Sequence, residues 1–234
     1  MPTELPSQPP VPALVLTGGG ARAAYQVGVL KAVAELLPQE ANPFRVIVGT
    51  SAGAVSAAVL AARAEHWHEA VAGHRRGVGE FPHFADLRCA TALDGALRIA
   101  LGCCRCCRAD CSCVRRVHCS TNSPLRELLK REVRWRAVGR SIRHGWVDAL
   151  ALCSTEYATA RSVAFFEGRA EFSEWSGHHH IGRRARLTLS HLMASMAVPL
   201  MFPPEQIDEE FYGDGAVRQM APLRQRCSWA RTGC

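Results

Sequence analysis

The first part of the chain alternates between two hydrophobic patterns. Residues 13–17, ALVLT, form a short apolar run that ends in glycines, which predicts a buried strand. In residues 23–38 the apolar side chains recur at helical spacing, at Val27, Leu30, Ala34 and Leu37. Residues 44–50, FRVIVGT, predict a second strand, and the alanine-rich segment 51–77 predicts a second helix. This order predicts an α/β fold with a mostly parallel sheet covered on both faces.

The second half of the chain shows less regular patterns. Residues 123–135 predict an amphipathic helix with Ser123 as its N-cap. Residues 146–155 and 161–168 predict two further strands, and residues 187–204 predict a helix that prolines end. No internal repeat is visible.

Length and composition are those of one globular domain. The 234 residues are 48% apolar and 21% charged, with a formal net charge of +7. This charge predicts attraction to anionic surfaces, such as phospholipid headgroups or nucleic acid. Because the basic residues are scattered and aromatic residues make up only 7% of the chain, nucleic acid is not expected as a partner.

The sequence offers no membrane-spanning or export signal. It lacks a run of 18 apolar residues, and its first residues lack the basic region and apolar core of a signal peptide. We therefore expect a cytoplasmic protein, with peripheral contact to a membrane surface as an open alternative. Cysteines in that compartment are expected to be reduced.

Seven of the eleven cysteines lie in residues 103–119, CCRCCRADCSCVRRVHC. A zinc site can be assembled there on paper from Cys104, Cys107, Cys111 and either His118 or Cys119. The adjacent doublets do not have the regular spacing of structural zinc ligands. We therefore favour a basic loop over a metal site, and we expect neither metal nor cofactor.

Ser51 lies in GTSAG, between Gly49 and Gly53, where a predicted strand gives way to a predicted helix. Glycines on both sides permit the tight backbone of a nucleophile elbow, which exposes a serine hydroxyl at the end of a sheet. The alternative is a serine that only caps the helix. The strand and helix context favours the catalytic interpretation.

A nucleophilic serine needs a base, and the histidines do not supply one in the expected order. In hydrolases with this elbow the acid precedes the histidine, but no histidine follows Asp214. A triad of Ser51 with His191 and Asp148 remains an alternative. Asp214, held between glycines in YGDGA, could itself take the proton if it were desolvated and close to the serine.

A third glycine-framed element follows the first predicted strand. Backbone N–H groups of Gly18, Gly19 and Gly20 could converge on an oxyanion. The segment matches neither the phosphate-binding P-loop nor the dinucleotide fingerprint. Arg22 could support this loop, or it could form a surface salt bridge.

The three elements together, GGGAR, GTSAG and DGA, resemble the patatin-like phospholipase family. The segment ASMAVPLMFPPEQIDEEFYGDGAVRQMAP resembles that family's approach to its aspartate, so the resemblance covers residues 13–74 and roughly 123–222. It implies a three-layer α/β/α fold and a metal-free serine–aspartate dyad that hydrolyses acyl esters of lipids. The implied roles are nucleophile for Ser51, base for Asp214, and an oxyanion hole at Gly18, Gly19 and Gly20 with Arg22 as support.

Two segments depart from that family. Residues 103–119 have no counterpart in it, and residues 223–234 replace the strand and helices with which it continues. We therefore divide the chain into a flexible leader over residues 1–12, an acyl hydrolase domain over residues 13–222 and a tail over residues 223–234. One hypothesis is that both unusual segments reflect local reading-frame changes. The alternatives to a lipid acyl hydrolase are a catalytically silent protein of the same fold and a histidine-dependent serine esterase.

Overall fold

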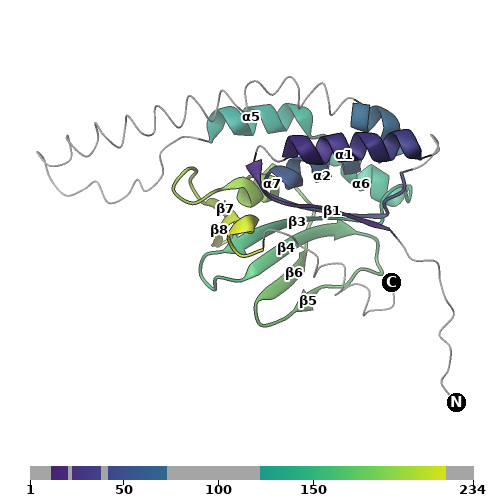
Figure 1. Ribbon diagram of the computed structural model, residues 1–234. Coiled ribbons are helices and arrows are strands. Elements are labelled where there is room, and N and C mark those ends of the chain that lie inside the picture. Colours follow the sequence, from purple (N-terminus) through teal and green to yellow (C-terminus); the bar gives the residue numbers. More distant parts are fainter. Residues whose placement is uncertain (1–11, 21–22, 38–41, 73–121, 220–234) are drawn as a thin grey trace, which may run out of the picture.

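The computed structural model describes residues 12–20, 23–37, 42–72 and 122–219, and a single sheet runs through them (Figure 1). In these ranges the sheet has eight strands. They are β1 (Ala13–Leu16), β2 (Val46–Thr50), β3 (Ala149–Glu156), β4 (Ser162–Gly168), β5 (Trp175–Ser176), β6 (His180–Arg184), β7 (Glu205–Ile207) and β8 (Glu210–Asp214).

The strand order is β1-β2-β3-β4-β6-β5, with β8 also paired to β3 and β7 paired to β8. The pairs β1–β2, β2–β3 and β4–β6 are parallel, and the other described pairs are antiparallel. The β1–β2 pair comes from the strand-helix-strand segment that the sequence predicted, and the β2–β3 pair joins that segment to the second half of the chain. Three of the antiparallel pairs, β3–β4, β5–β6 and β7–β8, join consecutive strands in the second half of the chain, and the fourth, β3–β8, joins distant ones.

One edge of β3 is shared by two strands that meet end to end. Strand β2 runs parallel to β3 and ends where Thr50 pairs with Cys153. Strand β8 runs antiparallel to β3 and ends where Asp214 pairs with Ser154, the next residue along β3. Because β2 and β8 approach from opposite directions, their last residues are neighbours. This topology brings Ser51, which follows β2, next to Asp214.

The described helices gather on one side of the sheet (Figure 1). They are α1 (Ala23–Leu36), α2 (Ala52–Ala62), the 3-10 helix η2 (Ala64–His66), the helical segment 67–72, α5 (Ser123–Glu132), α6 (Trp135–Arg143), α7 (Leu189–Met196) and the 3-10 helix η4 (Gly215–Val217). A multistrand sheet with flanking helices agrees with the expected α/β class. In the described residues these helices cover one face of the sheet, so the second helical layer of the expected α/β/α arrangement is not among them.

Helix α2 lies at the centre of the helical layer. All of its residues are buried, and it packs against the sheet as well as α1, α6 and α7. Its alanines have small side chains, which let these neighbours approach closely on every side. The main core joins α2 to the sheet through residues such as Leu60, Leu150 and Phe165. A smaller core on the opposite face of the sheet contains Val48, Ala151 and Phe166.

The structure corrects several expected boundaries. The helix expected over residues 51–77 stops at Ala62 and continues as η2 and the segment 67–72. The helix expected over residues 123–135 ends at Glu132, and Trp135 begins α6. Asn122 rather than Ser123 is the N-cap of α5, and Ser123 is its first helical residue. The hairpins β5–β6 and β7–β8 were not predicted.

Three sequence predictions fall outside the described residues. They concern the leader, of which only Pro12 is described, the cysteine-rich segment 103–119 and the tail 223–234. Over the part of the chain that the structure describes, every helix is too short or too polar to cross a bilayer.

Candidate active site

Ser51 adopts a backbone conformation that serine rarely occupies. Its φ is 53° and its ψ is −126°, at the junction between β2 and α2. A positive φ costs a residue with a side chain of order 1–3 kcal/mol and persists only where the surrounding structure enforces it. Ser51 is 9% exposed, so this strained turn is embedded in the protein.

The glycines that flank Ser51 allow the strand and the helix to approach each other closely. A Cβ atom on Gly49 would lie 2.6 Å from Cα of Ala54, in the first turn of α2. A Cβ atom on Gly53 would lie 2.4 Å from the carbonyl oxygen of Leu16, at the end of β1. Both contacts are far inside van der Waals distance, so the elbow requires glycine at both positions.

Asp214 ends β8 with its carboxylate turned to Ser51. The Ser51 hydroxyl donates a hydrogen bond to Oδ2 of Asp214 over 2.5 Å, and the N–H of Ala216 donates to Oδ1 over 2.7 Å. The N–H of Asp214 donates to the carbonyl of Ala197, and the Thr155 hydroxyl donates to the carbonyl of Asp214. The carboxylate and its backbone are therefore fixed at four points.

Burial sets the proton affinity of this carboxylate. Asp214 is 2% exposed, and its desolvation raises its pKa above the ordinary carboxyl value. The hydrogen bonds from Ser51 and Ala216 act in the opposite direction and partly offset that rise. The result is a stronger base than a solvated aspartate, in direct contact with a serine hydroxyl.

The glycine loop passes beside the serine. A Cβ atom on Gly18 would lie 2.9 Å from Cβ of Ala216 and 3.3 Å from Cβ of Ser51. Gly19 and Gly20 follow with φ values of 154° and 55°, a backbone that side chains disfavour. Gly18 thus lies next to both segments that carry the dyad residues. Arg22 lies outside the described residues.

His191 and Asp148, which would complete the alternative triad, contact other residues. The side chain of His191 caps α7, where its Nδ1 receives the N–H of Thr188 and the ring packs edge-on against Phe165. Burial lowers the pKa of His191, which keeps the ring neutral. Asp148 instead pairs with Arg45 over 2.6 Å and with Arg169 over 3.5 Å.

Cys153 is the other reactive side chain close to this junction. It is fully buried, and burial raises the pKa of its thiol to about 12. A thiol with that pKa stays protonated at neutral pH and is a poor nucleophile.

Sequence reasoning missed three residues around the dyad. Ser195 and Thr155 are buried and bond to backbone groups of the dyad residues. Tyr157 lies close enough to Gly213 that a Cβ atom there would lie 2.7 Å from the phenol oxygen. Burial, followed by the charge of Asp214, raises the pKa of Tyr157. No local motif singles out these side chains, because their partners lie far away in the sequence.

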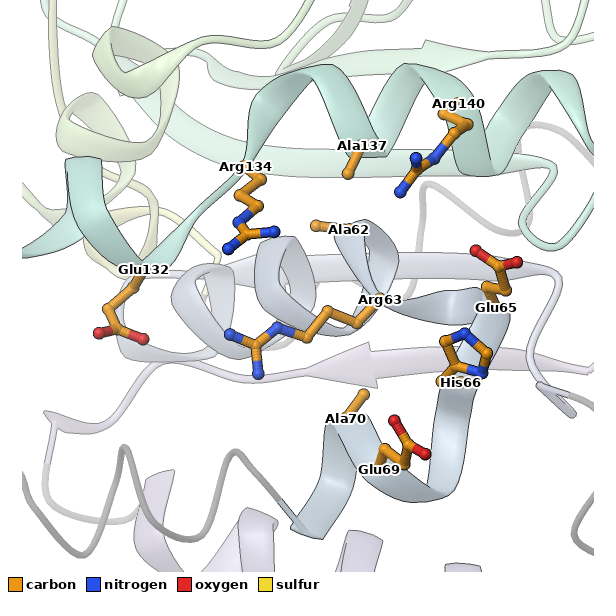
Figure 2. A pocket seen from close by; sticks show the side chains of 10 residues that line it. All are labelled: Ala62, Arg63, Glu65, His66, Glu69, Ala70, Glu132, Arg134, Ala137 and Arg140. Carbon is orange, nitrogen blue, oxygen red and sulfur yellow. The ribbon is translucent and has the colours of Figure 1, made fainter.

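A groove of about 320 Å³ lies at the other end of α2 (Figure 2). It is lined by Arg63, Arg134 and Arg140 together with Glu65, Glu69 and Glu132, besides His66 and three alanines. Its charges nearly balance. The 11 residues of α2 separate this end from Ser51 by about 16 Å, so the groove is separate from the dyad.

The described ranges contain no candidate metal centre. There, no group of three or more His, Cys, Asp or Glu side chains is arranged to hold a metal ion.

The comparison with known proteins supports the resemblance over the first part of the chain. The family model described as patatin-like phospholipase matches residues 14–71, about a quarter of the chain. No curated protein matches. The matched segment contains both the glycine loop and the elbow, but it ends well before Asp214. The predicted resemblance to patatin-like phospholipases is thus confirmed for residues 14–71.

Proposed function

We propose that this protein is a serine lipid acyl hydrolase in which Ser51 is the nucleophile and Asp214 is the general base. The observation that carries the proposal is the hydrogen bond of 2.5 Å between the Ser51 hydroxyl and a buried carboxylate oxygen of Asp214. A hydroxyl becomes a competent nucleophile when an adjacent base can take its proton. The strained elbow at Ser51 supports the same assignment, since strain of this kind clusters at functional sites.

The first half of the reaction transfers the acyl group to Ser51. Oδ2 of Asp214 takes the hydroxyl proton while Oγ of Ser51 forms a bond to the carbonyl carbon of the ester. The carbonyl oxygen gains the negative charge, and we assign its stabilisation to the N–H groups of Gly18, Gly19 and Gly20. The proximity of Gly18 to Ser51 supports that assignment. When the carbon–oxygen bond of the alcohol breaks, Asp214 returns the proton to the leaving alkoxide.

The second half releases the acid. Asp214, again ionised, takes a proton from a water molecule, whose oxygen attacks the carbonyl carbon of the acyl-serine. Collapse of the second tetrahedral intermediate breaks the bond to Oγ of Ser51, and Asp214 gives its proton back to that oxygen. The products are a carboxylic acid and an alcohol, and the dyad returns to its starting state.

Apolar surface beside the dyad supports a lipid as the acyl donor. Phe211 and Val217 lie three residues before and after Asp214, and they are 48% and 55% exposed. Leu200, between α7 and β7, is also exposed. Exposed apolar side chains near a reactive serine suit a substrate with acyl chains better than a polar ester.

The direct test is covalent labelling combined with turnover. A fluorophosphonate should label the wild-type protein at Ser51 and fail to label Ser51→Ala. Asp214→Asn keeps the shape of the side chain but removes the base, so we expect ester hydrolysis to fall by about 10²–10⁴-fold. Hydrolysis should be followed with both short-chain and long-chain esters.

His191→Gln is the matched control for Asp214→Asn. Glutamine at this position of a capping box can still receive the N–H of the N-cap residue, so α7 keeps its cap. Turnover by this variant should stay close to wild type. A collapse of turnover in His191→Gln with activity retained in Asp214→Asn would favour a histidine-dependent esterase. Absence of labelling in the wild-type protein would favour a catalytically silent one.

A further inference from the structure

The hydroxyl of Ser195 links three segments that are distant in the sequence. Ser195 lies in α7 and is completely buried. Its Oγ donates a hydrogen bond to the carbonyl of Cys153 in β3 over 2.6 Å. The same Oγ accepts the N–H of Ser51 over 3.0 Å, across 144 residues of sequence.

The directions of these two hydrogen bonds are fixed by chemistry. A hydroxyl has one proton, and a carbonyl can only accept, so the proton of Ser195 points to Cys153. The lone pairs of Oγ are then left for the Ser51 N–H. This N–H precedes α2 and belongs to a residue at positive φ. Without Ser195 it would be a buried donor that lacks this acceptor, which is costly.

The end of α7 also holds the other member of the dyad. The carbonyl of Ala197, two residues after Ser195, accepts the N–H of Asp214 over 2.8 Å. One short stretch therefore contacts the backbone of both Ser51 and Asp214. The stretch is itself anchored, because α7 packs on β3 and β8 and carries a capping box at its first turn.

We propose that Ser195 is a positioning residue that holds the Ser51 elbow in register with Asp214. This inference rests on the proposed function only for its consequence in catalysis, since the hydrogen bond to the Ser51 amide stands without it. Ser195 does not touch the reacting atoms. It acts by fixing the backbone of Ser51 so that Oγ stays within hydrogen-bond distance of the carboxylate, and small misplacements of such groups are costly.

Two substitutions test this role. Ser195→Ala removes the acceptor, and Ser195→Cys replaces it with a weak acceptor of similar shape. For both variants we expect kcat to fall about 10–100-fold with KM unchanged, because substrate binding is not altered while the attack geometry is. Ser141→Ala is the matched control, since Ser141 is an equally buried serine in α6. Its kcat should equal that of wild type.

A pH profile separates positioning from a general loss of structure. If Ser51 moves away, Asp214 loses a hydrogen bond that favours its ionised form. The acidic limb of kcat/KM should then shift to higher pH in both Ser195 variants and stay in place in Ser141→Ala. A fall of kcat that is equal in Ser195→Ala and Ser141→Ala, without a shift of the acidic limb, would overturn the proposal.

Amide hydrogen exchange tests the inference even in a protein without turnover. The N–H of Ser51 should exchange faster in Ser195→Ala than in wild type, while other amides of β2 keep their rates. Unchanged exchange at Ser51 would overturn the positioning role. An inactive and unlabelled wild-type protein with faster exchange in Ser195→Ala would overturn the proposed function alone.

Discussion

At the scale of single residues, the site depends on two polar side chains that satisfy each other away from water. A buried carboxylate without partners would be expensive, and it would take up a proton instead of staying charged. Within the described residues, the Asp214 carboxylate accepts two hydrogen bonds, one from the Ser51 hydroxyl and one from the N–H of Ala216. These offset part of the desolvation but leave the pKa of Asp214 raised. The residue therefore combines contact with the nucleophile and strength as a base.

The raised pKa of Asp214 predicts the acidic limb of the activity profile. The base must be ionised to act, so kcat/KM should fall about tenfold per pH unit below the pKa of Asp214 in the free enzyme. Because burial raises that pKa, the fall should begin at a higher pH than for a solvated aspartate near 3.9. Initial rates with a soluble ester across the acidic range would measure it. A profile that stays flat down to the ordinary carboxyl value contradicts this prediction.

The free energy of unfolding should change with pH in the direction opposite to that of kcat/KM. The folded state holds a proton on Asp214 at pH values where the unfolded chain has already lost it, since the folded pKa is the higher one. The contribution of Asp214 to the free energy of unfolding is therefore fully present below the unfolded pKa and falls as pH rises through the folded pKa. Denaturant unfolding of Asp214→Asn, which cannot titrate there, should lack this decline and serves as the control.

The sequence indicated some residues of the site and not others. Ser51 and Asp214 could be predicted because glycines mark the tight backbone on both sides of each, and glycine spacing is visible in one dimension. Ser195 and Thr155 could not, because each is defined by a backbone partner in another element. A serine near the end of a mostly apolar helix carries no local sign of what it will contact.

At the scale of elements, close packing around α2 forms the elbow. The first turn of α2 packs so tightly on the end of β1 that a Cβ atom at Gly53 would lie 2.4 Å from the carbonyl oxygen of Leu16. The glycine in the middle of α1 is different. A Cβ atom on Gly28 would meet no heavy atom within 4 Å, and Gly28 is exposed. Replacing glycine by alanine is therefore expected to destabilise the protein in α2 and to stabilise it in α1.

Gly53→Ala and Gly28→Ala should change stability in opposite directions. Gly53→Ala forces a backbone contact in the core, which typically costs about 1–3 kcal/mol, and it should also displace Ser51 and reduce hydrolysis. Gly28→Ala replaces a flexible residue inside a helix and should gain about 0.5–1 kcal/mol with hydrolysis unchanged. Urea unfolding measures both. Destabilisation by Gly28→Ala as large as that by Gly53→Ala would contradict the packing described for α2.

Element prediction succeeded where one pattern was sufficient. The strands β1 and β2 and the helices α1 and α2 have clear apolar periodicity and were expected near their observed positions. The break at Arg63 was missed because alanine favours a continuous helix and neither glycine nor proline marks the end of α2. Hairpin β7–β8 was missed because its strands are short and mostly polar, and β8 is held in the sheet by long-range pairing with β3.

At the scale of the whole molecule, the end-to-end meeting of β2 and β8 on β3 explains why residues 163 positions apart share a hydrogen bond. The segments just before and after Asp214 lie at the surface. Phe211 and Val217 are exposed there, whereas Leu36, which is 85% exposed, lies at the far end of α1. Because α1 has 14 residues, Leu36 lies about 20 Å from the N-terminal end of this helix, which follows the glycine loop.

This arrangement predicts that the protein contacts lipid surfaces with the side of the molecule that carries Asp214. Phe211→Ser and Val217→Ser should each weaken binding to vesicles of anionic phospholipid by about tenfold, because less apolar surface leaves water on contact. Hydrolysis of a short soluble ester should remain unchanged, since neither side chain bonds to the dyad. Leu36→Ser removes an apolar side chain that is even more exposed, and it should leave both measurements at wild-type values. Equal losses of vesicle binding in all three variants would instead indicate a diffuse attraction governed by the net charge of +7.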